Sequence, residues 1–338
     1  MPKLSFLIKR IRYLDYKAMF NAVDEVSRAS HKPKLFILRD VVYCGLKYGA
    51  SPYDYKIFGF EELNRAQRAT FVTRSRAYDL DHLLNDPAAK HYVNNKFEFL
   101  QEYKDFVKRK WINVDEASFD DFVELVGDAD AIMLKPIDEA GGKGVEKVKR
   151  KNFDSLESMY EYVKNSGKKL AEEVVIQHPD LAAIYPYSLN TCRLVTVLSE
   201  EKGPHIMYAI IRIGSHGMEI DNISSGGMYC PINVETGVIC GPGCDYNVNT
   251  YECHPDTGVK LEGIQIPRWE EVKSLVMEAT KVHPELALLG WDVAISTTDL
   301  QLIEANDYPG NEPMQMKGHI QGTKQGLLPE YRKYVKGI

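Results

Sequence analysis

The second half of the chain constrains the fold most, because strand-like runs follow one another there with a single long helix between them. Apolar runs at residues 193–198, 206–213, 291–295 and 300–304 have the composition of buried strands. The long helix is expected at about residues 268–282. This order of elements predicts an α+β body.

The first 90 residues differ from the rest and predict a helical N-terminal region. Apolar side chains recur at helical spacing in Tyr16–Val26 and again in Leu35–Leu46. The segment Tyr48–Lys56 is rich in aromatic residues and turn formers, so we expect a loop held in place by its tyrosines. No series of strand, glycine-rich turn and helix indicates a dinucleotide-binding fold in this part.

The segment from residue 91 to residue 190 mixes helices and strands. We expect helices at 95–107, 120–126 and about 154–165, and strands at 131–135, 144–149 and 170–177. The chain is long enough for two or three packed subdomains. The expected division is a helical region at 1–90, a first lobe at 91–170, a second lobe at 171–325 and a C-terminal tail at 326–338.

Bulk composition excludes some classes of partner. The 338 residues carry a net charge of -6, so nothing indicates wholesale binding of nucleic acid. The apolar run Leu4–Ile8 is broken by basic residues and is too short for a signal peptide, and no run approaches a membrane span. We therefore expect a cytoplasmic protein. The basic N-terminus either packs on its own domain or makes peripheral contact with an anionic membrane.

Six cysteines in a chain without a secretion signal predict reduced thiols. Cys240, Cys244, Cys253 and His254 resemble the spacing of metal ligands only loosely. The alternative is a set of small residues in a loop-rich part of a sheet. The sequence leaves metal binding at these four residues open.

A glycine-rich stretch follows the strand at 131–135. Gly141, Gly142 and Gly144 surround Lys143, and a second strand follows at once, so the stretch predicts an antiparallel hairpin and not a Walker loop. Glycines let backbone amides approach an anion, and Lys135 at the end of the first strand could reach the same anion. A simple hairpin whose lysines serve solubility explains the stretch equally well when it is taken alone.

A stronger functional signal lies near the C-terminus. Asp292 lies on one expected strand, and Glu304 and Asn306 lie on the next, two residues apart and therefore on one face. Three oxygen ligands without histidine or cysteine suit magnesium bound to nucleotide phosphates. Arg193 and Arg212 could bind phosphate or acyl-phosphate oxygens, although a surface ion pair is the alternative for each.

The order of these features resembles the ATP-grasp superfamily. The resemblance covers most of the chain, and the branches most similar to it are the glutamate-ligase-like enzymes and the sugar-transfer-associated ATP-grasp proteins. It implies an ATP-grasp fold in which two α+β lobes clamp ATP behind a helical N-terminal region. The sequence departs from many members because it lacks a Rossmann-like region before the ATP-binding lobes. Either the helical region or another element is therefore expected to supply that wall of the acceptor pocket.

The resemblance also implies a role for each candidate residue. ATP phosphates would contact Lys96, Lys135 and the hairpin residues Gly141, Gly142, Lys143 and Gly144. The backbone around Glu172, Glu173, Val174 and Val175 would contact adenine, and Gln177 is a candidate for contact with the ribose. Asp292, Glu304 and Asn306 would hold Mg²⁺, and Arg193, Arg212 and Asn222 would face the transferred phosphoryl group.

The implied activity is an ADP-forming carboxylate–amine ligase that works through an acyl phosphate. It would join small molecules, such as an amino acid and a sugar or cell-surface polymer precursor. Two alternatives stay open: a small-molecule kinase with the same fold, which needs the same lysines and magnesium ligands, and a non-catalytic nucleotide-binding partner of a glycosyltransferase. The oligomeric state and the identity of both substrates are left open.

Overall fold

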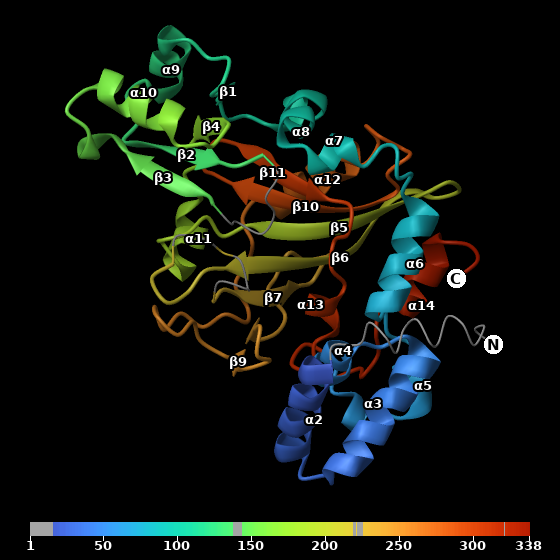
Figure 1. Cartoon of the computed structure of the whole chain (residues 1–338). Coiled ribbons are helices and arrows are strands. Elements are labelled where there is room, and N and C mark those ends of the chain that lie inside the picture. The colour runs from blue at the N-terminus through green and yellow to red at the C-terminus, as the bar shows by residue number, and fades with distance from the viewer. Residues whose placement is uncertain (1–15, 138–143, 219–220, 222–225, 321) are drawn as a thin grey trace.

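The computed structural model describes residues 16–137, 144–218, 221, 226–320 and 322–338. In these residues the chain forms a small antiparallel sheet, a larger antiparallel sheet and a cluster of N-terminal helices (Figure 1). No helix in the described ranges is long and apolar enough to cross a membrane. The α+β class expected from the sequence is confirmed.

The N-terminal helices form a core of their own. Helices α2 (Tyr16–Ser30), α3 (Lys34–Tyr48), α4 (Pro52–Ile57) and α5 (Arg65–Arg68) surround buried aromatic side chains that include Phe58, Phe60 and Phe71. A 3-10 turn, η1 (Phe60–Glu62), precedes α5.

The expectation of a loop at residues 48–56 is partly wrong, because residues 52–57 are the helix α4. Ser51 caps this helix by accepting from the Asp54 backbone amide, while the Asp54 side chain accepts from the Ser51 amide. Pro52 occupies the first helical position, where its missing N–H costs nothing. The Ser-x-x-Asp pattern is a readable capping signal.

Three helices connect the N-terminal cluster to the two sheets. Helix α6 (Arg74–Leu84) packs on the large sheet and not on the N-terminal core, and α7 (His91–Asn94) and α8 (Lys96–Glu102) follow it. The helix expected at 95–107 is therefore shorter, and a 3-10 turn, η2 (Lys104–Phe106), continues it. Asn95 begins α8 by accepting from the amides of Phe97 and Glu98.

The small sheet has the strand order β1–β4–β2–β3, with every neighbouring pair antiparallel. Its strands are β1 (Trp111–Asn113), β2 (Ala131–Lys135), β3 (Glu146–Lys149) and β4 (Leu170–Glu173). A 3-10 turn, η3 (Arg150–Asn152), follows β3. Helices α9 (Phe119–Val126) and α10 (Leu156–Asn165) cover one face, where Phe122 and Met159 are fully buried. The opposite face is directed toward the large sheet (Figure 1).

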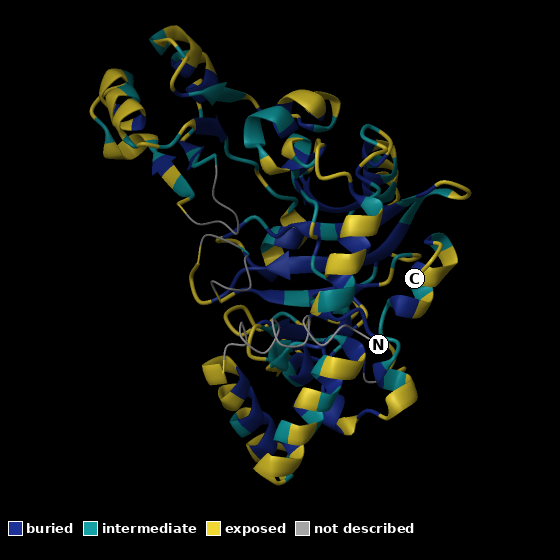
Figure 2. Ribbon diagram, turned by 45° about the vertical axis from the view of Figure 1, so that its right-hand side comes forward, coloured by how far each residue is buried: buried dark blue, intermediate teal, exposed yellow. Residues whose placement is uncertain are grey.

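The large sheet has the antiparallel order β11–β10–β5–β6–β7–β8–β9. Its strands are β5 (Cys192–Ser199), β6 (Gly203–Ile213), β7 (Met228–Ile232), β8 (Gly243–Asp245), β9 (Thr250–Tyr251), β10 (Leu288–Ile295) and β11 (Leu300–Asn306). Helices α11 (Pro179–Ile184) and α12 (Trp269–Ala279) contribute to the core on one face. Helices α6, α13 (Glu312–Gln315) and α14 (Leu328–Tyr334) cover the other face, so the central strands are buried on both sides (Figure 2).

The buried side chain of Gln315 fastens the C-terminal segment to the linker before α6. Its Oε1 accepts from the Val72 amide at 2.8 Å and from the Leu327 amide at 3.0 Å. Its Nε2 donates to the carbonyls of Val72 at 2.9 Å and Asn311 at 3.1 Å. The last residues, expected as a tail, thus include the helix α14, whose Leu328 and Tyr331 are buried against the large sheet.

Replacing Gln315 with leucine should lower the free energy of unfolding by about 3 kcal/mol, because the amides of Val72 and Leu327 lose their buried acceptor. Urea denaturation followed by circular dichroism measures the change. The control is Gln325→Leu at an exposed position, which should change stability by less than about 0.5 kcal/mol. Equal losses in the two variants would contradict the role given to Gln315.

Candidate functional site

A cavity of about 280 Å³ lies between the small sheet and the large sheet. Helices α7 and α8, the ends of β2 and β4, and strand β11 supply its walls. The polar and charged residues that line it are Asn94, Lys96, Arg109, Lys135, Glu172, Glu304 and Asn306. The fold therefore brings two predicted phosphate-binding lysines together with two predicted magnesium ligands.

Strand alternation explains why these side chains face the cavity. On β2 the side chains of Ile132 and Leu134 are buried beneath α9 and α10, so Lys135 points to the opposite face. On β4 the side chain of Ala171 is buried with them, and Glu172 points to the cavity. Lys96 reaches across from α8 and donates from Nζ to the Ile137 carbonyl at 3.1 Å.

Glu172 carries a buried negative charge between two cations. Its Oε2 accepts from Arg109 Nε at 2.8 Å, and its Oε1 forms an ion pair with Lys135. Burial by itself would raise the pKa of Glu172, but the charges of Arg109 and Lys135 outweigh burial and lower the pKa to about 2. The carboxylate is therefore ionised at neutral pH and holds Lys135 at the edge of the cavity.

Arg109 was not among the residues predicted from the sequence. Its buried guanidinium joins the two lobes, because it binds Glu172 on β4 and donates to the carbonyls of Leu302 at 2.7 Å and Ile303 at 3.1 Å on β11. In the sequence it lies between Lys108 and Lys110, and such a run of basic residues predicts side chains exposed to solvent. No local pattern distinguishes its buried role.

A second charged cluster lies on the large sheet around the buried carboxylate of Asp292. Arg193, directly opposite on β5, donates to both Asp292 oxygens at 2.6 Å. Arg212 on β6 donates to Asp292 Oδ2 and, at 3.0 Å, to Asp221 Oδ1. Burial would raise the pKa of Asp292, but the two guanidinium groups lower it to about 2. Both predicted arginines thus meet at one predicted metal ligand.

Glu304 and Asn306 lie beside this cluster at the cavity wall. Asp292 faces Glu304 in the strand register, whereas the next residue, Val293, faces Leu302. Ile303 is therefore an extra residue in β11 and forms a β-bulge. Bulges of this kind often adjoin active sites. Burial raises the pKa of Glu304, and the negative charge of Asp292 raises it further.

This donor set fits a divalent cation that prefers oxygen. Glu304 and Asn306 lie together at the cavity wall. Both oxygens of Asp292 already accept from Arg193 and Arg212, so Asp292 would share these oxygens between the guanidinium groups and a cation. A cation at this place would remove the repulsion between the carboxylates. Mg²⁺ favours such hard oxygen ligands together with water and phosphate.

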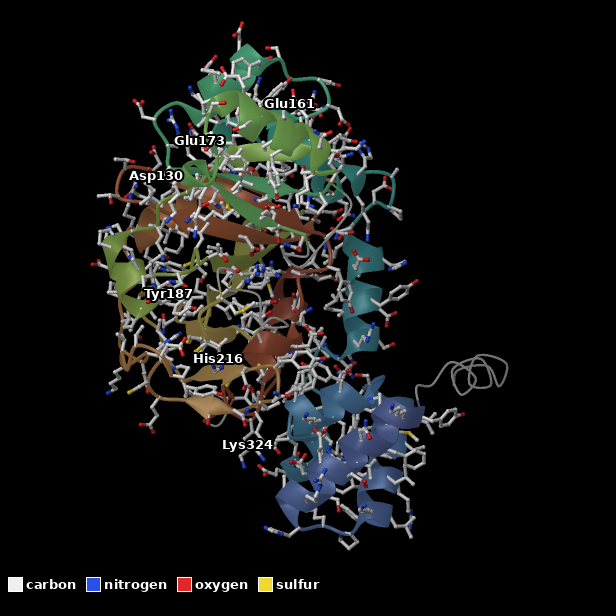
Figure 3. The ribbon with its side chains drawn as sticks, turned by 60° about the vertical axis from the view of Figure 1, so that its left-hand side comes forward. Asp130, Glu161, Glu173, Tyr187, His216 and Lys324 are labelled. Atoms are coloured by element: carbon white, nitrogen blue, oxygen red, sulfur yellow. The ribbon has the colours of Figure 1, made fainter. Side chains whose placement is uncertain are left out.

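The other predicted site residues lie elsewhere. Glu173 accepts from the Lys110 amide at 2.8 Å on the small lobe (Figure 3), and neither it nor Val174 nor Val175 lines the cavity with its side chain. Strand β4 ends at Glu173, so the strand expected to reach residue 177 is shorter. Gly144 has a positive φ of 69° just before β3. Gly141, Gly142, Lys143 and Asn222 lie outside the described residues.

The side chain of Gln177 stabilises the loops on either side of α11. It donates from Nε2 to the carbonyls of Tyr185 at 3.0 Å and Ser188 at 2.7 Å, and its Oε1 accepts from the Asn190 amide at 3.1 Å. These contacts use the donor and acceptor capacity that the predicted contact with ribose would need.

The cysteine-rich segment was the other candidate metal site. The described residues contain no group of three or more His, Cys, Asp or Glu that could hold a metal ion. The ring of His254 is buried and contacts the Gly214 carbonyl through Nε2 at 2.8 Å, and Cys244 is buried beside Gly318.

Comparison with known proteins identifies a family whose sequence model matches this chain. The sequence model described as "Sugar-transfer associated ATP-grasp" matches residues 75–330, which is more than half of the chain. No curated protein sequence matches the chain.

Several solved structures are similar at low identity. The ATP-grasp ligase PsnB in complex with a minimal precursor has 13% identity and a TM-score of 0.42 over 78% of this chain. D-alanyl-alanine synthetase A from Vibrio cholerae has 12% identity and a TM-score of 0.44 over 73% of this chain. N5-carboxyaminoimidazole synthetase from Staphylococcus aureus, in complex with ADP, has 12% identity and a TM-score of 0.43 over 74%. The matches span 70%, 65% and 58% of those chains, respectively.

Glu172→Gln should lower the free energy of unfolding at neutral pH by about 3 kcal/mol, because Arg109 and Lys135 lose their buried counter-ion. The normal pKa of 4.5 is lowered to about 2 in the folded protein, so this stabilisation is complete above pH 4.5 and is lost as the pH falls toward 2. The difference in free energy of unfolding between wild type and variant should therefore become smaller as the pH is lowered.

Urea titrations at neutral pH and at the lowest pH at which both proteins still fold measure this difference in free energy of unfolding. Glu173→Gln is the matched control, since this neighbouring carboxylate binds a backbone amide and forms no ion pair within the described residues. A stability difference that stays constant with pH would show that Glu172 is not held ionised by its two partners.

Proposed function

Because the chain belongs to the sugar-transfer associated ATP-grasp family, as its sequence predicted, we propose that it is an ATP- and Mg²⁺-dependent ligase. It would join a carboxylate to an amine and release ADP and phosphate. The observation that carries this proposal is the cavity between the sheets, where Lys96 and Lys135 face Glu304 and Asn306. Cations for phosphate oxygens and oxygen ligands for Mg²⁺ thus converge on one space.

ATP would lie in this cavity with its phosphates toward the large sheet. Lys96 and Lys135 would contact the phosphates, and the hairpin with Gly141, Gly142, Lys143 and Gly144 would cover them. The backbone of residues 172–175 leaves the cavity wall at the end of β4 and would contact adenine. The three hydrogen bonds of Gln177 favour a structural part for this residue over contact with ribose.

Asp292, Glu304 and Asn306 would hold Mg²⁺, which, when bound, neutralises phosphate charge and orients the transferred group. Arg193 and Arg212 converge on Asp292, so both would lie beside the transferred phosphoryl group. Asn222 would act with them, and its neighbour Asp221 already binds Arg212. The arginines would stabilise negative charge as it develops on the transferred phosphoryl oxygens.

The reaction needs positioning and charge neutralisation but no nucleophilic side chain. A substrate carboxylate oxygen would bond to the γ-phosphorus of ATP, and the bond between that phosphorus and the β–γ bridging oxygen would break, releasing ADP. The amine nitrogen would then bond to the carbonyl carbon of the acyl phosphate. Phosphate would leave with the electron pair of the broken C–O bond. A nitrogen that arrives as ammonium would lose one proton before it attacks and a second one as the amide forms.

The family description supports a substrate connected with sugar transfer. We propose that the products are conjugates of an amino acid with a sugar or with a cell-surface polymer precursor, made in the cytoplasm, where ATP is available. Both substrates would be small molecules, and the net charge of -6 does not favour nucleic acid.

Incubation of the protein with Mg²⁺, ATP and pairs from a panel of carboxylates and amines should yield ADP and inorganic phosphate only when both substrates are present. Phosphorus NMR of the products measures this outcome. Transfer of phosphate to a stable acceptor would instead identify a kinase, and ATP binding without turnover would identify a nucleotide-binding partner. Formation of AMP would contradict both phosphoryl-transfer schemes.

Lys135→Ala should weaken binding of Mg²⁺·ATP by about tenfold or more, because a charge-assisted contact to phosphate is lost. The control is Lys147→Ala on the neighbouring strand β3, where the side chain is exposed. Isothermal titration calorimetry measures both affinities, and circular dichroism checks that the fold is kept. Equal affinities of the two variants would place the phosphates away from β2.

A further inference from the structure

A second cavity, of about 180 Å³, lies where the N-terminal helices meet the large sheet. Its walls come from α4 and α13, from strands β5, β6 and β7, from the residue after β8, and from the segment between β11 and α13. We call it the tyrosine pocket after the residues that dominate it. They are Tyr53, Tyr229, Tyr246 and Tyr308, together with Arg193 and Glu312.

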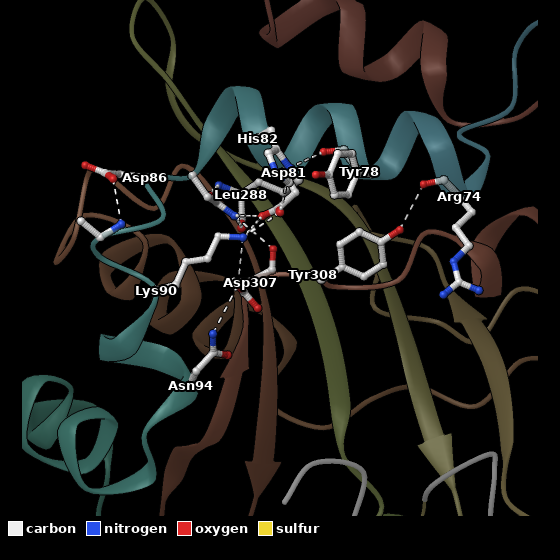
Figure 4. A network of polar contacts seen from close by, with 12 residues as sticks. Arg74, Tyr78, Asp81, His82, Asp86, Lys90, Asn94, Leu288, Asp307 and Tyr308 are labelled. Carbon is white, nitrogen blue, oxygen red and sulfur yellow. Dashed lines mark hydrogen bonds and ion pairs between the residues drawn. The ribbon is translucent and has the colours of Figure 1, made fainter. Parts of the chain in front are cut away.

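Three of the four tyrosines are held in place by ring stacking or by a hydrogen bond. Tyr53 from α4 and Tyr246 stack with ring centroids 5.3 Å apart and an interplanar angle of 26°. The Tyr308 hydroxyl donates to the Arg74 carbonyl at 3.2 Å (Figure 4). Aromatic faces carry partial negative charge and attract ammonium groups.

A network behind Tyr308 fixes the segment that carries it. Lys90 binds both oxygens of Asp81 at 2.7 Å and Asp307 at 3.1 Å (Figure 4). Asn85 donates to the carbonyls of Leu288 at 2.9 Å and Asp307 at 3.0 Å. The end of β11 is thereby anchored to α6 and β10, so this wall of the pocket is preorganised.

Glu312 places a partly buried carboxylate in the wall of the pocket. In the described part of the chain this carboxylate forms no ion pair, although it lines the cavity. Burial raises the pKa of Glu312, and the charge of Asp54 adds to the rise, while backbone amides and Arg74 oppose it. A buried acid that lacks a cation is costly unless a ligand supplies one.

The pocket adjoins the proposed site of phosphoryl transfer through Arg193. This side chain lines the tyrosine pocket, binds Asp292, and lies 3.7 Å from Glu304, which lines the first cavity. A molecule in the tyrosine pocket would therefore lie next to the group activated in the first cavity. Its volume is small compared with typical ligand pockets, so it suits one small group.

We infer that the tyrosine pocket binds the amine substrate of the ligase, and that Glu312 and the tyrosine faces hold its ammonium group. This inference rests on the proposed function, because it assigns one of the two substrates to a place. The helical N-terminal region, through Tyr53, would then form part of the acceptor site. The ligand proposed for this pocket is a primary amine that is protonated in solution.

Ligand-observed NMR titration of the full chain with propylammonium chloride, in the presence of Mg²⁺ and ADP, tests the assignment. Propylammonium should bind, whereas 1-propanol, which has the same chain without charge, and acetate should bind at least about tenfold more weakly. Comparable affinity for 1-propanol would show a pocket that only accommodates apolar groups. Preferred binding of acetate would show an anion site around Arg193. Either result overturns the inference.

Glu312→Gln should weaken propylammonium binding by about tenfold, because it keeps the shape of the side chain and removes the charge. Tyr246→Leu, at a half-exposed position that tolerates replacement, should also weaken it several-fold. The control Glu161→Gln lies on the exposed face of α10 in the small lobe (Figure 3) and should bind propylammonium like wild type. Unchanged affinity in both pocket variants, or an equal loss in the control, overturns the inference.

Binding of Mg²⁺·ADP, measured in the same samples, separates this inference from the proposed function. Loss of propylammonium binding with intact Mg²⁺·ADP binding in Glu312→Gln supports the amine subsite. Mg²⁺·ADP binding by a wild-type protein that does not bind propylammonium overturns the subsite and leaves the nucleotide site standing. Failure of the wild type to bind Mg²⁺·ADP removes the proposed function, and the subsite inference falls with it.

Discussion

The structure depends on a buried guanidinium, that of Arg109, which links the small sheet to the large one. It binds the Glu172 carboxylate on one side and backbone carbonyls of β11 on the other. A buried arginine is stable only where its donors are satisfied, and here both lobes must be in place to satisfy them. This contact ties Lys135, through Glu172, to the strand that carries Glu304, and so helps to set the relative position of these two side chains.

Ordinary sequence patterns predicted much of the fold. The period-two spacing of Glu304 and Asn306 placed them on one face, and both line the cavity. The pairing of a strand at 131–135 with one at 144–149 was also readable, because the first is a short apolar run and the second has the pattern of its partner; the second strand is Glu146–Lys149 in the structure. The ATP-grasp fold itself came from the order of many modest motifs, none of which was decisive alone, and the family match confirms it.

Other features depend on contacts that no local pattern encodes. Arg109 looks like part of a solvated basic run, and its burial follows from a partner 63 residues away. The bulge at Ile303 is set by packing between strands and not by a glycine or proline. The short helix α4 was overlooked although Ser51 and Asp54 form a capping box, since aromatic and turn-forming residues suggested a loop.

Helix α4 has a consequence for how this protein could be altered. It is six residues long, is closed at its start by its own capping box, and presents Tyr53 to the tyrosine pocket. Most of its stabilising hydrogen bonds are local, so side chains on its surface can change while the helix persists. If the tyrosine pocket takes the amine as proposed, replacing the side chain at position 53 would change substrate preference and leave the residues proposed to bind ATP untouched.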